Sequence, residues 1–164
     1  MGAVAELWRH PIKSHGRETL DAVEFTAGAC MPWDRHWAVT HDATKFNDTG
    51  WAHCRNFMIG ARTPALAGIW ATFDEDAGQI TLRHQDLGSV TFDPDLQSDD
   101  FVEWVAPICP PDRASPKAIV KAADRGMTDS SFSSVSIMNR ASHAAVEAAI
   151  GRPVEQERWR ANIW

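Results

Sequence analysis

The chain lacks tyrosine altogether and has only three cysteines among its 164 residues. Cys30, Cys54 and Cys109 are odd in number and widely spaced. This argues against a disulfide framework and favours a reducing, cytoplasmic location. None of the three belongs to a CxxC or CxxH pattern, so the sequence predicts no structural metal site.

An excess of positive charge and long apolar runs are also absent. The formal net charge is −6, which gives no global support for a nucleic-acid partner, although a local basic pocket remains compatible with it. No run of about 18 apolar residues occurs, so we expect no membrane-spanning helix and no membrane partner. The N-terminus has no basic region followed by an apolar stretch, so we expect no signal peptide.

The first half of the chain alternates apolar and polar residues over short stretches, which predicts strands. The predicted strands span residues 3–8, 18–25, 32–40, 64–73, 79–84 and 89–93, with a polar loop over 41–49. The turn at 74–78 predicts a hairpin. Closing these strands into an antiparallel β-barrel would remove their exposed edges. We therefore expect a β-barrel subdomain over residues 1–95.

The pattern changes in the second half, where we expect a connector and a partial mixed segment over residues 96–164. A helix is predicted within 95–105 and a proline-rich connector over 106–116. Strands are predicted at 118–122 and 134–138, with a loop between them, and the start of a further strand at 156–164. A helix is predicted from Asn139 or Arg140 to Ile150, where Gly151 and Pro153 end it. The predicted fold class is α+β.

The turn after the first predicted strand presents a lysine and a hydroxyl side by side. Pro11 fixes the backbone before Lys13 and Ser14, and Gly16 frees it after them, which suits a loop that holds an anionic ligand. An ordinary solvated turn is the alternative. The flanking histidines have no carboxylate or thiol partner in the sequence pattern and define no metal site.

Four short motifs resemble those of the MOSC family, and they occur in the family's order. The family consists of proteins in which an N-terminal β-barrel subdomain is joined to a molybdenum cofactor sulfurase C-terminal domain. The motifs are His10-Pro11-Ile12-Lys13-Ser14, Trp33-Asp34-Arg35-His36-Trp37, Val135-Ser136-Ile137-Met138-Asn139-Arg140-Ala141-Ser142 and Arg158-Trp159-Arg160-Ala161-Asn162-Ile163. The resemblance covers residues 4–164.

The resemblance implies that the chain binds the molybdenum cofactor (molybdopterin) or a similar phosphorylated heterocycle. The residues it places at the cofactor are Lys13, Ser14, Arg35, Arg160 and Asn162, with hydroxyl or acidic residues from 129–134. Arginine forks and a lysine point charge suit a phosphate. An ordinary ion pair between Asp34 and Arg35 is the alternative for that pair.

The chain departs from the family at its end. The family's molybdenum-ligating cysteine lies downstream of the Arg-x-Asn motif, and the three cysteines present here do not align with it. A molybdenum centre needs such a soft thiolate, so we expect an incomplete molybdoenzyme and leave its enzymatic status open. For Cys54, next to His53 and Arg55, both a reactive thiol and a buried structural cysteine are compatible with the sequence.

Two further functions remain open. One is a non-catalytic interaction module, in which an unfinished sheet edge after Ile163 pairs with a second copy or a complementing partner chain. The other is a truncated fragment of a molybdenum-dependent reductase or sulfur-transfer enzyme. The sequence identifies no substrate for any of these.

Overall fold

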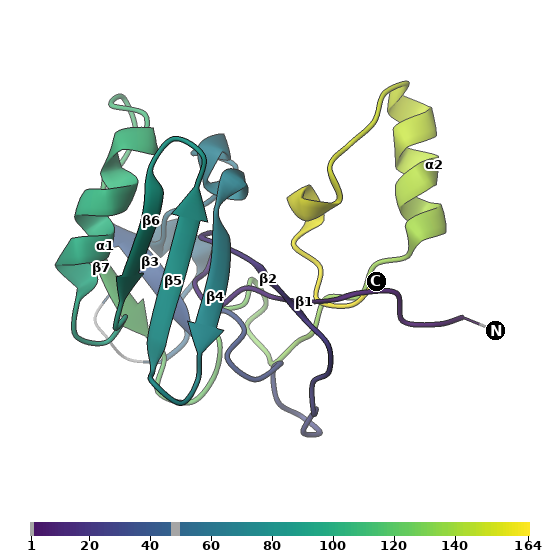
Figure 1. The fold of residues 1–164 in the computed structure, drawn as a ribbon, viewed down its shortest axis with the longest axis horizontal. Helices are drawn as coiled ribbons and strands as arrows, with labels where there is room; N and C mark the ends of the chain where they lie inside the picture. The colour runs from purple at the N-terminus through teal and green to yellow at the C-terminus, as the bar shows by residue number, and fades with distance from the viewer. Residues whose placement is uncertain (1, 47–49) are drawn as a thin grey trace.

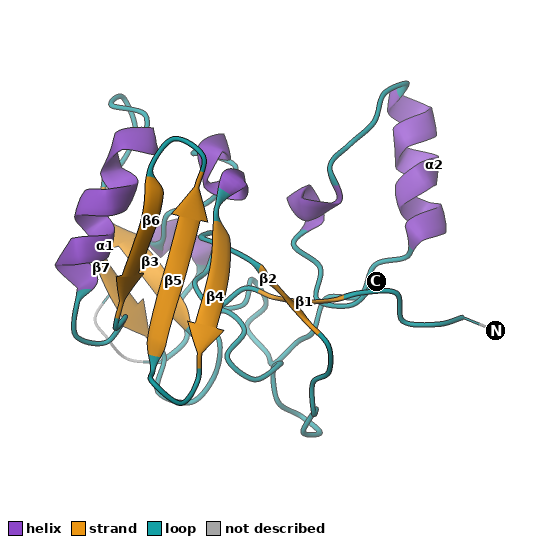
Figure 2. Cartoon of the chain, in the orientation of Figure 1, coloured by secondary structure: helices purple, strands orange, loops and turns teal. Residues whose placement is uncertain are grey.

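The computed structural model describes residues 2–46 and 50–164. It consists of a β-rich body and a C-terminal arm that carries one α-helix and a short 3₁₀ helix, with the N-terminal segment running between them (Figure 1). Figure 2 shows that loops make up much of the chain outside the body. Part of the loop predicted over 41–49, namely 47–49, lies outside the described residues.

The described strands form three antiparallel sheets. The first pairs β1 (Leu7–Arg9) with β2 (Glu18–Leu20), and the second pairs β3 (Trp37–His41) with β7 (Pro116–Lys121). The third contains β4 (Trp70–Asp74), β5 (Gln79–His84) and β6 (Gly88–Phe92). The antiparallel α+β character is therefore confirmed, and so is the predicted hairpin between β4 and β5.

The predicted closed barrel is not seen, because the described strands remain in separate sheets. The break between β2 and β4 has a visible cause. The backbone N–H of Ala71 donates to the Arg17 carbonyl at 2.8 Å, but the next inward N–H, that of Phe73, donates to the Glu18 carboxylate at 2.9 Å. A side chain thus takes the place of a backbone acceptor, and no ladder continues across the gap.

The core lies between the three-stranded sheet and the β3–β7 pair. The alternation of β4 and β5 places Phe73, Ile80 and Leu82 inside. The helix predicted within 95–105 is confirmed as α1 (Ser98–Val105), whose Phe101 and Val105 are fully buried. Since α1 packs on β6 and β7, residues beyond 95 also contribute to the body, and the boundary predicted there stays a prediction.

Several predicted strands are corrected by the structure. Residues 64–68 form a 3₁₀ helix that begins at Pro64, so only the second half of the strand predicted at 64–73 is real. Proline cannot donate to a ladder. The segment 134–138 is extended but makes only an isolated bridge, from Ile137 to Ile163. The start of 156–164 is a 3₁₀ helix, Gln156–Trp159, and not a strand.

The helix predicted near the C-terminus is confirmed as α2 (Arg140–Ile150). The side chain of Asn139 accepts hydrogen bonds from the N–H groups of Ala141 and Ser142, at 2.8 and 3.2 Å, and so caps the first turn. Gly151 ends the helix with φ of 71°. No residue of α2 is buried, so local capping defines a helix that packs little against the body.

The last residues lie against the first strand. The Trp164 N–H donates to the Glu6 carbonyl at 3.1 Å, and the Trp8 N–H donates to the Asn162 carbonyl at 2.8 Å. Ile163 bridges Leu7 on one side. The end of the chain is therefore held in place. None of the helices in residues 2–46 and 50–164 is long and apolar enough to cross a membrane.

Candidate functional site

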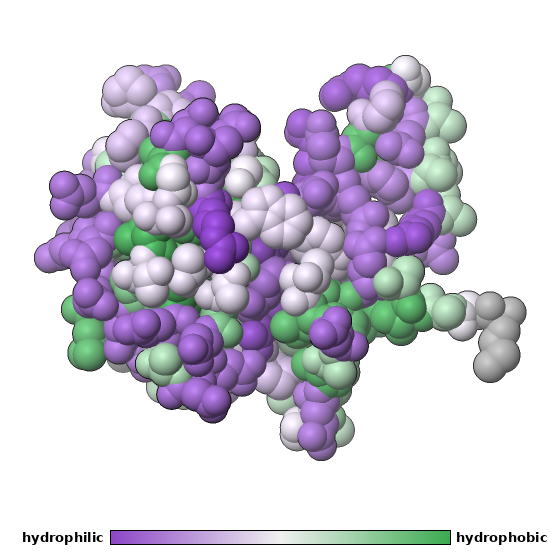
Figure 3. Space-filling view, in the orientation of Figure 1, coloured by the Kyte–Doolittle hydropathy of each residue, from purple (hydrophilic) through white to green (hydrophobic). Residues whose placement is uncertain are grey.

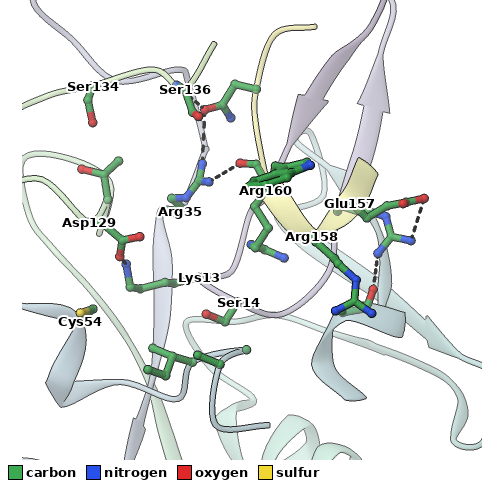
Figure 4. Close-up of a pocket in the computed structure, with 18 of the residues that line it drawn as sticks. Lys13, Ser14, Arg35, Cys54, Asp129, Ser134, Ser136, Glu157, Arg158 and Arg160 are labelled. Carbon is green, nitrogen blue, oxygen red and sulfur yellow. Dashed lines mark hydrogen bonds and ion pairs between the residues drawn. The ribbon is translucent and has the colours of Figure 1, made fainter. Parts of the chain in front are cut away.

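An open pocket of about 1160 Å³ lies between the body and the C-terminal arm. Figure 3 shows the molecule hollowed between these two parts. The five residues predicted from sequence all line this pocket: Lys13, Ser14, Arg35, Arg160 and Asn162. The fold thus brings three distant segments of the chain to one place (Figure 4).

The loop that carries Lys13 is fixed by its backbone. The Lys13 N–H donates to the Trp37 carbonyl at 2.8 Å, and Ser14 has φ of 65°. Gly16 has φ of 80°, and a Cβ there would lie 3.0 Å from the Cβ of Ala71. Only glycine meets both conditions without strain, so the loop's return onto the β4 backbone depends on this residue.

The ammonium of Lys13 is already paired. Its Nζ donates to the Met127 carbonyl at 2.8 Å and to Asp129 Oδ1 at 2.5 Å. Burial lowers the pKa of Lys13, and the hydrogen bond and charge of Asp129 oppose that shift. Burial raises the pKa of Asp129, but the hydrogen bond from Lys13 and the charges of Lys13 and Arg35 lower it overall. The Lys13 side chain is 4% exposed and that of Asp129 is 82% exposed.

Arg35 ties the pocket walls together. Its guanidinium donates to the Asp34 carboxylate and, at 2.7 Å, to the Arg160 carbonyl. Its backbone carbonyl accepts from the Met127 N–H at 2.7 Å. The ion pair that was one alternative for Asp34 and Arg35 is present, and Arg35 lines the pocket at the same time. The two alternatives are therefore compatible.

Arg160 and Asn162 differ in how many of their side-chain polar groups are used in hydrogen bonds within the protein. An Arg160 Nη donates to the Gly16 carbonyl at 3.2 Å. Burial, and then the charge of Arg35, lower the pKa of Arg160 to about 9, which leaves it charged at neutral pH. The Asn162 amide donates to the Trp8 carbonyl at 3.1 Å and accepts from the Ser136 N–H at 3.0 Å. Asn162 is 1% exposed, so it mainly fastens the pocket wall.

Three of the lining residues have left-handed backbones. The φ angles of Ser14, Arg35 and Arg160 are 65°, 51° and 48°. In the described part of the chain, Trp33 is the one other non-glycine residue with positive φ. Such conformations are uncommon outside glycine and gather at ligand and active sites. The strain in this protein is therefore concentrated around the pocket.

Sequence reasoning missed Arg17, which also lines the pocket. Its guanidinium lies 4.1 Å from the ring centroid of Trp70 and 3.7 Å from a carboxylate oxygen of Glu157. Burial lowers the pKa of Arg17, and the charge of Glu157 opposes this. Its buried Nε has no hydrogen-bond partner among residues 2–46 and 50–164. The sequence signal that could have identified Arg17 is its position directly after Gly16, at the end of the Lys13 loop.

The lining is basic although the protein is acidic. Five lining residues are cationic and three are anionic: Lys13, Arg17, Arg35, Arg158 and Arg160 against Asp129, Glu155 and Glu157. The net charge of the whole chain is −6. Cations gathered in a hollow raise the local concentration of anions. The arrangement therefore suits a negatively charged ligand.

The histidines near the Lys13 loop lie in the interior. His10 and His15 are 1% and 0% exposed. Burial, and then the charge of Arg160, lower the pKa of His10 well below its usual value, and burial lowers that of His15 to about 4. Both are neutral core residues at neutral pH. Across the described residues, no cluster of three or more histidine, cysteine or acidic side chains could hold a metal ion.

Cys54 also lines the pocket, where it is half-buried. Its Sγ lies 3.6 Å from Nδ1 of His53. Figure 4 shows Cys54 on the same side of the pocket as Lys13 and Asp129. The alternative of a buried structural cysteine is therefore not met, because Cys54 is only half-buried.

The chain was also compared with known proteins. No curated protein matches it. The model of the family described as the MOSC N-terminal beta barrel domain matches residues 1–105, which is more than half of the chain and includes Lys13, Ser14 and Arg35. The match includes the first two of the four motifs, and the expected family membership is thereby confirmed: the chain belongs to the MOSC N-terminal beta barrel domain family.

Proposed function

We propose that the pocket binds a phosphorylated heterocycle, and that molybdopterin is the candidate ligand favoured by family membership. The observation that carries the proposal is the set of left-handed residues Ser14, Arg35 and Arg160 around one cation-rich hollow. Backbone strain persists where the surrounding fold enforces it, and it is enriched at ligand sites.

The donor set fits such a ligand. Guanidinium groups offer charge-assisted forks that match a phosphate. Within the described part of the chain, the N–H of the buried Arg17 Nε donates to no acceptor. Hydroxyl groups line the other side of the pocket, where Ser130 and Ser134 share a hydrogen bond at 2.9 Å. Hydroxyls can accept or donate to a polar ring without adding charge.

The proposed roles follow from these positions. Arg160, with Arg17 and Arg35 nearby, would hold the phosphate, and Ser14 would orient it. Bound there, the cofactor would supply a molybdenum centre for redox chemistry. Among the described lining residues the thiol is that of Cys54, which does not correspond to the family's ligating cysteine. The proposal is therefore one of cofactor binding, with no reaction assigned to the chain.

The proposal is tested by the cofactor content of protein made in a host that synthesises molybdopterin. We expect about stoichiometric pterin, measured by fluorescence after oxidation, and molybdenum by elemental analysis. Arg160→Gln, which removes the guanidinium proposed to hold the phosphate, should lower the pterin content severalfold. Arg113→Gln removes an exposed arginine outside the lining and should leave it unchanged. Wild-type protein that carries neither pterin nor molybdenum would refute the proposal.

A second function, the interaction module, is favoured by a specific observation. Ile137 is 71% exposed on the extended segment beside Ile163, and α2 has no buried residue. Ile163 itself is bridged by both Leu7 and Ile137, so the edge left for pairing is that of residues 134–138 and not the one expected after Ile163. We infer that a strand of another chain, either a second copy or a partner, pairs with the 134–138 edge. Light scattering of the wild type and of Ile137→Asp tests this. A strict monomer in both, over a wide concentration range, counts against self-association.

We also propose a cytoplasmic location. Cys30, Cys54 and Cys109 are all free, which agrees with a reducing compartment. Labelling of the thiols in freshly lysed cells tests this. Three reactive thiols per chain are expected, whereas extensive oxidation in the cell would contradict it.

A further inference from the structure

The pairing of Lys13 raises a question about how an anion reaches it. The Lys13 side chain is nearly buried, whereas that of Asp129 is largely exposed. Figure 4 shows the Asp129 carboxylate against the end of the Lys13 side chain. The other acceptor of the ammonium is the buried Met127 carbonyl, at 2.8 Å. An anion that approaches Lys13 from the pocket therefore meets the carboxylate of Asp129 first.

We propose that Asp129 is a specificity-determining residue of this pocket. Its carboxylate is paired with the Lys13 ammonium in the free protein, and it competes with the anionic group of the ligand for that ammonium. This inference rests on the proposed function, because it takes an anion to be the ligand.

The competition discriminates between anions. A carboxylate tethered beside the ammonium has a high effective concentration, so a free monoanion gains nothing by replacing it. A phosphate dianion brings a second charge and more acceptor oxygens, which the nearby guanidinium groups can bind at the same time. The pocket therefore selects multiply charged anions over single carboxylates.

The structure allows the carboxylate to leave while the loop stays in place. The backbone around it is held by Arg125, whose Nη donates to the Ser130 carbonyl at 2.7 Å, and by the bond from the Met127 N–H to the Arg35 carbonyl. The Asp129 side chain itself lies mostly in solvent. Its rotation breaks one ion pair, and the incoming dianion takes the place of the carboxylate, so the buried ammonium is not left unpaired.

The experiment compares anion binding by wild type, Asp129→Asn and Glu155→Gln at pH 7.5 and constant ionic strength. Inorganic phosphate and acetate are titrated and followed by NMR chemical shifts. The control removes the same charge from the same pocket, but Glu155 pairs with Arg158 at 2.6 Å and not with Lys13. Matching amide spectra establish that each variant is folded. Asp129→Ala is a second variant in which the affinity for phosphate should also rise.

We expect Asp129→Asn to bind phosphate about fivefold or more tightly, because a like charge next to the anion is removed. Acetate binding should become measurable in that variant. Glu155→Gln should change either affinity less than twofold, and adding Lys13→Met to Asp129→Asn should abolish the gain.

Equal or weaker phosphate binding by Asp129→Asn overturns the inference, and so does an equal gain in Glu155→Gln. Neither result affects the pterin content of the wild type, on which the proposed function depends. If no protein binds phosphate but the wild type carries pterin, the inference alone falls. If phosphate binding and pterin are both absent, the proposed function falls as well.

Discussion

A guanidinium nitrogen of Arg35 donates to the carbonyl oxygen of Arg160 at 2.7 Å, across a separation of 125 residues. Both residues have left-handed backbones and both line the pocket. This bond joins the N-terminal body to the C-terminal arm at the place where the charges gather. The pocket is therefore a product of the whole chain, although the family model covers only residues 1–105.

Gly16→Ala should destabilise the protein by about 1–3 kcal/mol, because it combines a left-handed backbone with a close contact. The new Cβ would lie 3.0 Å from the Cβ of Ala71. Gly78→Ala is the matched control, since Gly78 has φ of 67° with open space around it. Urea denaturation should show the larger loss for Gly16→Ala, and equal losses would contradict the role of the contact.

Asn162→Ala should loosen the C-terminal arm. It removes the partners of the Trp8 carbonyl and the Ser136 N–H. The expected cost is about 1–3 kcal/mol, mainly for the buried Trp8 carbonyl left unpaired. Hydrogen exchange should rise at Ser136 and at residues 162–164. Asn139→Ala removes only the cap of α2, costs about 1 kcal/mol, and should leave exchange at residues 162–164 unchanged. Similar protection in wild type and Asn162→Ala would refute the fastening role.

Stability should fall as the pH drops from about 6.5 towards 4. Burial lowers the pKa of His15 to about 4 in the folded protein, so the unfolded state binds this proton first. Stability is therefore complete above the unfolded pKa and decreases below it, by on the order of 3 kcal/mol for this residue.

The measurement is urea denaturation of wild type and His15→Gln at pH 7 and pH 4.5. The loss between the two pH values should be smaller in the variant, because one buried titrating group has been removed. Part of the dependence of stability on pH should remain in the variant, because burial also lowers the pKa of His10. An identical loss in both proteins would show that His15 does not contribute.

Trp159→Ala should weaken binding of a phosphorylated heterocycle and leave inorganic phosphate unaffected. Trp159 lines the pocket, is 38% exposed, and donates its indole N–H to His143 at 2.9 Å. An oriented, exposed indole can stack on a flat ring, for an expected loss of about fivefold or more. Calorimetry with flavin mononucleotide and with phosphate separates the two effects. Equal weakening of both ligands would argue against stacking.

Local features could be predicted from sequence because their causes are local. The caps of α2 at Asn139 and Gly151, and the alternation of β4 and β5, depend on neighbouring residues only. The Lys13 loop was identified in the same way, from Pro11 and Gly16. The five predicted site residues do share one pocket, while their role in binding remains a proposal.

The sequence by itself determined the residue types of the pocket, the positions of its turns and the family motifs. Only the tertiary structure decided that Lys13 is paired with Asp129, 116 residues away, and that Arg17 lies over Trp70. It also decided that the Glu18 carboxylate takes the N–H of Phe73, so the sheets do not close. The reason is physical: periodicity and capping act within a few residues, whereas the partner of a buried charge depends on which distant segments the folded chain brings together.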